Sequence, residues 1–160
     1  MAIYLKPNDF VLENGELRLK KEGFSFVFFK TTACLYCNDV MPAFREISKR
    51  IQGCNFCEMD VYQNNSELVQ MASKSTTPLT YVPYLLLYWK GRPIEQFKPN
   101  ESDASQNTNL MMQFFMQQHE KVSKNIQQPP THPEISQYSI GIPGNHKGRV
   151  CRLTYEAAYQ

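Results

Sequence analysis

The sequence FSFVFFKTTACLYCNDVMPAFREISKRI, which spans residues 24–51, decides the fold of this chain. It opens with aromatic and β-branched residues, a composition typical of a strand that is buried on both faces of a sheet. Residues 31–33 interrupt this run, and apolar residues then recur with the period of a helix. These apolar residues are Val40, Met41, Phe44, Ile47 and Ile51. The stretch therefore predicts a buried strand, a short loop and an amphipathic helix, in that order.

A Cys-x-x-Cys pair, Cys34 and Cys37, lies where the predicted helix begins. Backbone N–H groups have no intrahelical partner there, and the helix dipole presents its positive end. Both effects stabilise a thiolate and so lower the pKa of a thiol. We therefore predict that Cys34, which we expect to be the more exposed of the two thiols, is the nucleophile. Cys37, one turn later, can attack a mixed disulfide at Cys34 and resolve it.

Further apolar patterns follow along the chain. They predict a strand over residues 55–61, a short helix over 66–73 and an amphipathic helix through 110–122. Between the two helices, Val82-Pro83 precedes the apolar run YLLLYW, and Lys90-Gly91 then turns the chain. The run predicts a strand that opens on a proline, a position that sheets tolerate.

Taken together, the Phe-rich strand, the Cys-x-x-Cys pair, Pro42 inside the helix and the Val82-Pro83 strand resemble the thioredoxin superfamily. The resemblance covers roughly residues 18–125. It implies an α/β, thioredoxin-like fold with a central mixed β-sheet flanked by helices, and a proline, usually cis, at Pro83. It also implies thiol–disulfide exchange on protein disulfides, in which Pro83 positions an extended substrate chain beside Cys34.

The resemblance also assigns residues to the site. It makes Cys34 and Cys37 the catalytic pair. The residues between and opposite them are then expected to bind the substrate. These substrate-binding residues are Leu35, Tyr36, Val82 and Pro83.

Three positions depart from the family pattern. Ala33 stands where an aromatic residue often precedes the first cysteine, and Lys98-Pro99 stands where a glycine is expected after the last strand. Phe28 stands where thioredoxins carry a buried carboxylate, so this side chain cannot take up a proton from Cys37. These departures favour an alternative in which the pair is inert and the domain is a scaffold for interactions.

A second Cys-x-x-Cys pair, Cys54 and Cys57, gives the two pairs together the spacing of a four-cysteine zinc site. The second pair overlaps the strand predicted over residues 55–61. Side chains three residues apart on a strand face opposite sides of the sheet. We therefore expect no metal site, and we interpret Cys57 as a buried apolar cysteine and Cys54 as a loop thiol.

The two ends of the chain predict additions to this domain. Residues 1–17 contain Asn14-Gly15 between two short apolar runs, which indicates a hairpin-like extension. Residues 126–160 begin as a Pro-containing linker, and apolar residues then alternate at strand spacing over 138–142 and again over 151–155. Two such short strands are not stable alone, so they must dock on their own domain or on a partner. We predict an extended C-terminal arm that docks on an assembly partner.

Composition limits the class of protein. Hydrophobic residues make up 42% of the chain and charged residues 20%, as in ordinary globular domains. The net charge of +2 is dispersed, so we expect no nucleic-acid partner. No apolar run approaches the roughly 20 residues that a membrane helix needs, and we expect no membrane contact.

The cysteine count bears on the compartment. The chain has 5 cysteines, an odd number, and no signal peptide is visible at its start. This combination indicates mostly free thiols in a reducing compartment, so we predict a cytoplasmic protein. Thiol–disulfide exchange needs no cofactor beyond the dithiol, and its partners are protein disulfides or dithiols.

The Asn/Gln/Tyr/Phe-rich composition and the sequence RVCRLTYE, residues 149–156, are also similar to the thioredoxin-like proteins of large DNA viruses. This looser resemblance implies the alternative function: a non-catalytic structural or interaction protein, such as a minor capsid protein or another virion component. Its location would then be the virion.

Overall fold

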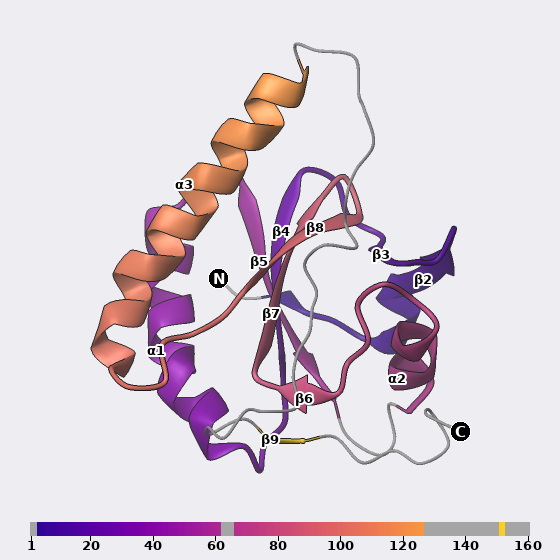
Figure 1. Cartoon of the computed structure of the whole chain (residues 1–160), viewed down its shortest axis with the longest axis horizontal. Coiled ribbons are helices and arrows are strands. Elements are labelled where there is room, and N and C mark those ends of the chain that lie inside the picture. The colour runs from indigo at the N-terminus through magenta and orange to yellow at the C-terminus, as the bar shows by residue number, and fades with distance from the viewer. Residues whose placement is uncertain (1–2, 62–65, 127–150, 153–160) are drawn as a thin grey trace.

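The computed structural model describes residues 3–61, 66–126 and 151–152. Its centre is a five-stranded sheet in the order β1-β5-β4-β7-β8 (Figure 1). β5 runs parallel to β1 and β4, whereas β7 runs antiparallel to both β4 and β8. The α/β architecture with a central mixed sheet, predicted from the sequence, is therefore confirmed. The strands are β1 (Ile3–Tyr4), β4 (Phe24–Lys30), β5 (Cys54–Asp60), β7 (Tyr84–Trp89) and β8 (Arg92–Phe97).

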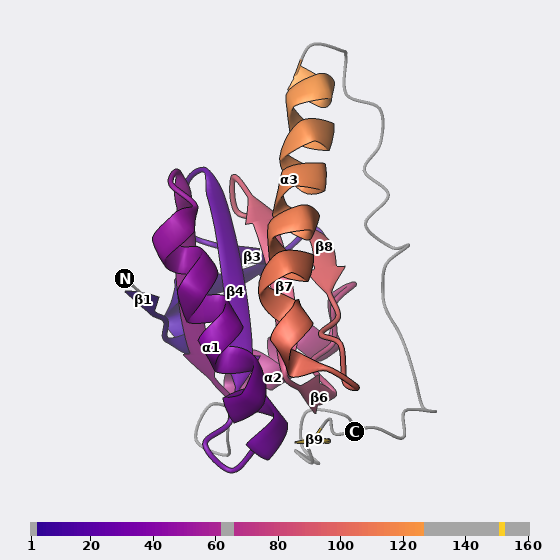
Figure 2. The ribbon, with the colours of Figure 1, turned by 90° about the vertical axis from the view of Figure 1, so that its left-hand side faces the viewer.

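Helices α1 (Leu35–Arg50) and α3 (Asn107–Ile126) cover one face of the sheet, as Figure 2 shows. The aromatic ring of Phe26 in β4 lies 5.5 Å from that of Phe44 in α1 and 5.8 Å from that of Phe114 in α3. All seven β4 residues except Lys30 are buried, as the sequence predicted for a central strand.

The opposite face of the sheet is covered by α2 (Ser66–Ser73) and by a hairpin of β2 (Phe10–Glu13) and β3 (Glu16–Leu19) (Figure 1). The hairpin turn consists of Asn14 and Gly15, which both have positive φ, as a type I′ turn requires. The predicted hairpin and the predicted helix over residues 66–73 are thus confirmed. Two short 3₁₀ helices, η1 (Pro7–Asp9) and η3 (Ala104–Gln106), precede β2 and α3.

The hairpin is joined to the domain rather than held apart from it. The Leu19 N–H donates to the Gly91 carbonyl at 2.9 Å, and the Tyr88 hydroxyl donates to the Leu17 carbonyl at 2.9 Å. β3 crosses the boundary predicted between residues 17 and 18, and β1, from the predicted extension, is a strand of the central sheet. The division into three segments itself stays a prediction.

An ion pair also fastens the hairpin to β8. Both carboxylate oxygens of Glu16 accept hydrogen bonds from Arg92, at 3.1 and 3.0 Å, and one also accepts from Arg18. Burial by itself would raise the pKa of Glu16, but the hydrogen bonds and charges of Arg92 and Arg18 outweigh burial and lower it.

The segment before β7 brings two distant parts of the chain together. The Val82–Pro83 peptide bond is cis, as the family resemblance implied. Just before it, β6 (Tyr81–Val82) pairs antiparallel with β9 (Cys151–Arg152). Residues 151–152 therefore dock on the chain's own domain, one of the two alternatives drawn from the sequence, and docking of residues 126–160 on an assembly partner stays a prediction. The strand expected around residues 138–142 lies outside the described residues.

No helix within the described residues is long and apolar enough to span a lipid bilayer.

Gly91 offers a test of how closely the hairpin packs on the sheet. It has φ of +81°, and a Cβ added there would meet the Leu19 carbonyl oxygen at 2.5 Å. We expect Gly91→Ala to lower the free energy of unfolding by about 2–4 kcal/mol, because a left-handed conformation and a steric clash both add to the cost. The matched control is Gly15→Ala. Gly15 has φ of +76° but open space around it, so we expect this substitution to lower the free energy of unfolding by only about 1–2 kcal/mol. Equal losses in urea unfolding would contradict close packing at Gly91.

The Glu16 ion pairs should make stability depend on pH. Because folding lowers the pKa of Glu16, its contribution is complete above the ordinary value of 4.5 and is lost as pH falls through the lower folded value. As the pH is lowered from 4.5 through the folded pKa of Glu16, we therefore expect the free energy of unfolding of wild type to fall relative to that of Glu16→Gln. Parallel pH profiles of the two proteins in thermal unfolding would show that the pair contributes nothing.

Candidate active site

Cys34 lies in the loop between β4 and α1 and is the N-cap residue of α1. Its backbone is extended, with φ of −84° and ψ of 109°, so its side chain turns back over the first turn of the helix. The Cys34 Sγ accepts a hydrogen bond from the Cys37 N–H at 3.1 Å. A thiolate at this position would therefore be stabilised by a backbone donor and by the helix dipole.

The same sulfur touches the segment that contains the cis proline. Cys34 Sγ lies 3.9 Å from the carbonyl oxygen of Val82, to which the protonated thiol donates. Val82 precedes Pro83, so the structure brings together Cys34, Val82 and Pro83 from segments 48 residues apart. This is the juxtaposition that the family resemblance implied.

Both thiols of the pair are buried. Cys34 is 0% exposed and Cys37 is 1% exposed, and neither is in a disulfide. The prediction that Cys34 is the more exposed of the two is therefore wrong. Leu35, at 75%, is the exposed residue of the motif. A disulfide substrate can reach the Cys34 sulfur only when a neighbouring segment moves.

Tyr36 and Pro83, both predicted to bind substrate, line one pocket of about 290 Å³. The pocket brings Tyr36, which is 2% exposed, next to residues from β6, β8 and the chain after β8. Lys98 and Pro99, which depart from the family pattern, form part of its wall. The remaining lining residues are Tyr81, Gln96 and Glu101. Burial raises the pKa of Tyr81, whose hydroxyl accepts a hydrogen bond from the Gln96 amide at 2.7 Å.

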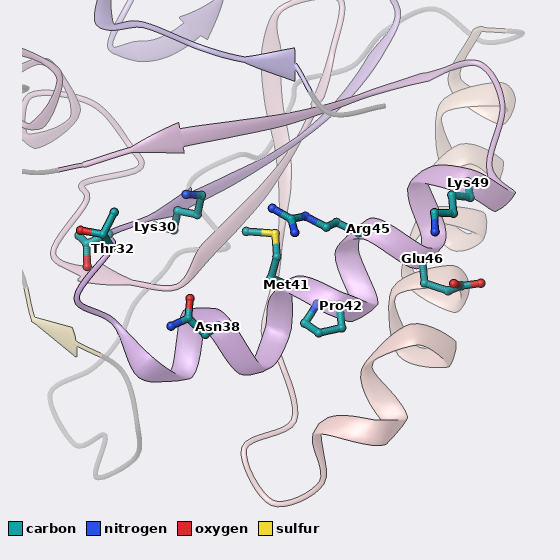
Figure 3. A pocket seen from close by; sticks show the side chains of 9 residues that line it. Lys30, Thr32, Asn38, Met41, Pro42, Arg45, Glu46 and Lys49 are labelled. Carbon is teal, nitrogen blue, oxygen red and sulfur yellow. The ribbon is translucent and has the colours of Figure 1, made fainter.

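A larger pocket, of about 580 Å³, lies along the outer side of α1 (Figure 3). Lys30 reaches it from the end of β4, and Met41 and Arg45 reach it from α1. Its other lining residues are Thr31, Thr32, Asn38, Pro42, Glu46 and Lys49.

Beside this pocket is a buried carboxylate that the sequence analysis missed. Glu58 in β5 is 2% exposed and lies opposite Phe28 in the sheet register. Lys30 Nζ and Arg45 Nε each lie 3.8 Å from its oxygens, and Oε2 has no hydrogen-bond partner in the described part of the chain. The position of Glu58 in the sequence could have identified it as a buried carboxylate. Glu58 lies between Cys57 and Met59 in the predicted strand, and a strand of a sheet that is covered on both faces buries side chains of both parities.

The second Cys-x-x-Cys pair lies elsewhere. Cys54 is opposite Phe24 at the far end of β4, about 20 Å along the strand from the loop that holds Cys34. Cys54 is the first residue of β5 and half-buried, rather than a loop thiol, and Cys57 is buried. Within residues 3–61, 66–126 and 151–152, no group of three or more His, Cys, Asp or Glu side chains could hold a metal ion.

The pKa values of these two thiols give a test. Burial raises the pKa of Cys54 and that of Cys57 to about 12 each. At pH 8 each thiol should therefore hold about a thousandfold less thiolate than an ordinary cysteine and react correspondingly slowly with iodoacetamide. Cys34, at the helix N-terminus, should be alkylated first and Cys37 should be protected. Mass mapping against time checks the order, with urea-unfolded protein as the control. Rapid native labelling of Cys57 would contradict its burial.

Comparisons with known proteins agree with this architecture. No protein-family model matches the chain. Its fold is similar to that of thioredoxin f2 from Chlamydomonas reinhardtii, with a TM-score of 0.51, 18% identity and coverage of 82% of this chain and 100% of the other.

Two viral proteins are similar in sequence. Uncharacterized protein 196R of Invertebrate iridescent virus 6 is 30% identical over 138 residues, covering 86% of this chain and 75% of its own length. Uncharacterized protein 020R of Invertebrate iridescent virus 3 is 33% identical over 140 residues, covering 85% of this chain and 79% of its own length. The chain therefore has a thioredoxin-like fold and belongs to the family of these two iridescent-virus proteins.

Proposed function

We propose that this protein is a thiol–disulfide oxidoreductase that acts on protein disulfides through Cys34 and Cys37. One observation carries the proposal: the Cys34 sulfur accepts the Cys37 N–H at 3.1 Å and lies 3.9 Å from the Val82 carbonyl. The sulfur thus lies at a helix N-terminus and beside the backbone of the residue that precedes a cis proline.

In the proposed reaction, the Cys34 thiolate attacks one sulfur of a substrate disulfide and forms a mixed disulfide, and the other substrate sulfur leaves as a thiolate. Cys37 then attacks the Cys34 sulfur, forms the Cys34–Cys37 disulfide and releases the second substrate thiolate. The two protons of the protein dithiol pass to the two substrate thiolates. The substrate gains two electrons, which the dithiol supplies.

The roles of the surrounding residues follow from their positions. Val82 and Pro83 would present a backbone edge to an extended substrate segment. Leu35 is the exposed apolar residue next to the nucleophile, and Tyr36 lines the 290 Å³ pocket into which a substrate side chain would fit. The likeness to a thioredoxin fold supports protein thiols as the class of substrate.

A second candidate is a non-catalytic scaffold, including a virion or minor capsid component. The burial of both thiols favours it, because a buried sulfur cannot be attacked without a movement. The viral origin of the two relatives favours the virion setting. Quantifying the protein in purified, salt-washed particles would test that setting, and absence from them would exclude it.

Reduction of insulin by dithiothreitol tests the oxidoreductase proposal. We expect wild type to accelerate the reaction and Cys34→Ser to return it to the uncatalysed rate. Cys37→Ser combined with Cys151→Ser should instead accumulate a mixed disulfide between Cys34 and the substrate, which non-reducing electrophoresis detects. The matched control is Cys54→Ser, a distant cysteine, which should keep the wild-type rate. A folded wild-type protein that gives no acceleration would reject the oxidoreductase and leave the scaffold.

A further inference from the structure

The backbone edge of β6, which precedes the cis proline Pro83, is already paired with another strand of the same chain. β6, Tyr81–Val82, pairs antiparallel with β9, Cys151–Arg152. This edge is the one that would hold an extended substrate under the proposed function. Both views place β9 beside β6 and near the loop that leads into α1 (Figures 1 and 2). β9 therefore lies where a substrate strand would bind under the proposed function.

The register of this pairing selects one residue of the C-terminal segment. Cys151 is the residue opposite Val82, and Arg152 is opposite Tyr81. The Val82 carbonyl oxygen lies 3.9 Å from Cys34 Sγ, so Val82 is the shared neighbour of both cysteines. Residues opposite each other on antiparallel strands have Cα atoms about 4.5–5.5 Å apart. A pairing shifted by one residue would have placed Val150 or Arg152 opposite Val82, and neither could react with a thiol.

We propose that Cys151 is a third redox cysteine, which forms an intramolecular disulfide with Cys34 and thereby closes the substrate edge. The proposal rests on the proposed function, because it needs Cys34 to act as a nucleophile. Cys151 is the only one of the 5 cysteines that lies C-terminal to Cys57, and Arg149 and Arg152 flank it in the sequence. Nearby cationic residues favour a thiolate.

The reaction starts from the mixed disulfide between Cys34 and a substrate protein. The Cys151 thiolate attacks the Cys34 sulfur, a Cys34–Cys151 bond forms, and the bond between Cys34 and the substrate breaks. The substrate leaves as a thiolate and takes up the proton that Cys151 gave up. Over the whole cycle one substrate disulfide is reduced to two thiols, and the Cys34 and Cys151 thiols are oxidised to one disulfide. An external dithiol, by the same exchange in reverse, restores both thiols.

This assignment accounts for an observation that the sequence did not predict. Cys34 is 0% exposed, although a nucleophile that attacks proteins must be reachable. With β9 paired to β6, an incoming chain has to displace β9 before it can pair at Val82. A thiol tethered within the same chain can reach an effective concentration of order millimolar, so it would compete well with free thiols for a mixed disulfide at Cys34.

The test uses the full chain with Cys37→Ser, so that Cys151 is the expected resolving cysteine. The reduced protein is treated with excess bis(2-hydroxyethyl) disulfide at pH 8, quenched with acid and mapped by mass spectrometry. We expect a Cys34–Cys151 disulfide within one chain and little mercaptoethanol on Cys34. The matched control, Cys37→Ser with Cys151→Ser, should hold a stable mercaptoethanol adduct on Cys34 and release it at least about tenfold more slowly.

A register control sharpens the result. Moving the thiol by one residue, with Val150→Cys and Cys151→Ser in the same background, should lose most of the internal disulfide, because a one-residue shift turns the side chain to the other face. Separate mercaptoethanol adducts on Cys34 and Cys151, or a disulfide-linked dimer in place of the internal bond, would overturn the assignment of Cys151 alone. A Cys34 that stays unmodified in every variant would overturn the proposed function and this inference together.

Discussion

The helices and strands of this structure are arranged around the position of one sulfur atom, that of Cys34. Cys34 Sγ contacts the Cys37 N–H at 3.1 Å and the Val82 carbonyl at 3.9 Å, so a helix start and a cis-proline segment meet there. Neither contact is strong alone, because hydrogen bonds to sulfur are weak. Their geometry is kept by the elements that carry them: α1 is packed through Phe44 on the buried face of β4, and β7 is paired with β4 along its length. The sheet core therefore serves to hold two loops at a fixed separation.

Two buried carboxylates, those of Glu16 and Glu58, lie beside basic side chains. Glu16 joins the hairpin to β8 through its ion pair with Arg92. Glu58 lies opposite Phe28 in the sheet, and its carboxylate oxygens lie 3.8 Å from Lys30 Nζ and Arg45 Nε.

The backbone edge at Val82 connects the proposed disulfide exchange with the proposed regulation of substrate binding by β9. An extended chain can pair at Val82 only when β9 is absent from it, so substrate binding and β9 docking exclude one another. Any condition that fixes β9, such as a covalent bond to Cys34, would close the site, and a reducing dithiol would open it. Under this proposal, the burial of Cys34 and the pairing of β9 with β6 belong to one closed state.

The sequence by itself determined the local elements and their order. The apolar run of β4, the helical period of α1, the Asn14-Gly15 turn and the helix Ser66–Ser73 all follow from contacts within a few residues, so the sequence pattern was sufficient to predict them. The cis bond at Pro83 followed from the family resemblance. The burial of Cys34, the charge pairs of Glu58 and the pairing of Cys151 with Val82 were decided only by the tertiary structure. Each depends on segments tens of residues apart, and sequence periodicity carries no information about which distant strand or chain end covers a given side chain.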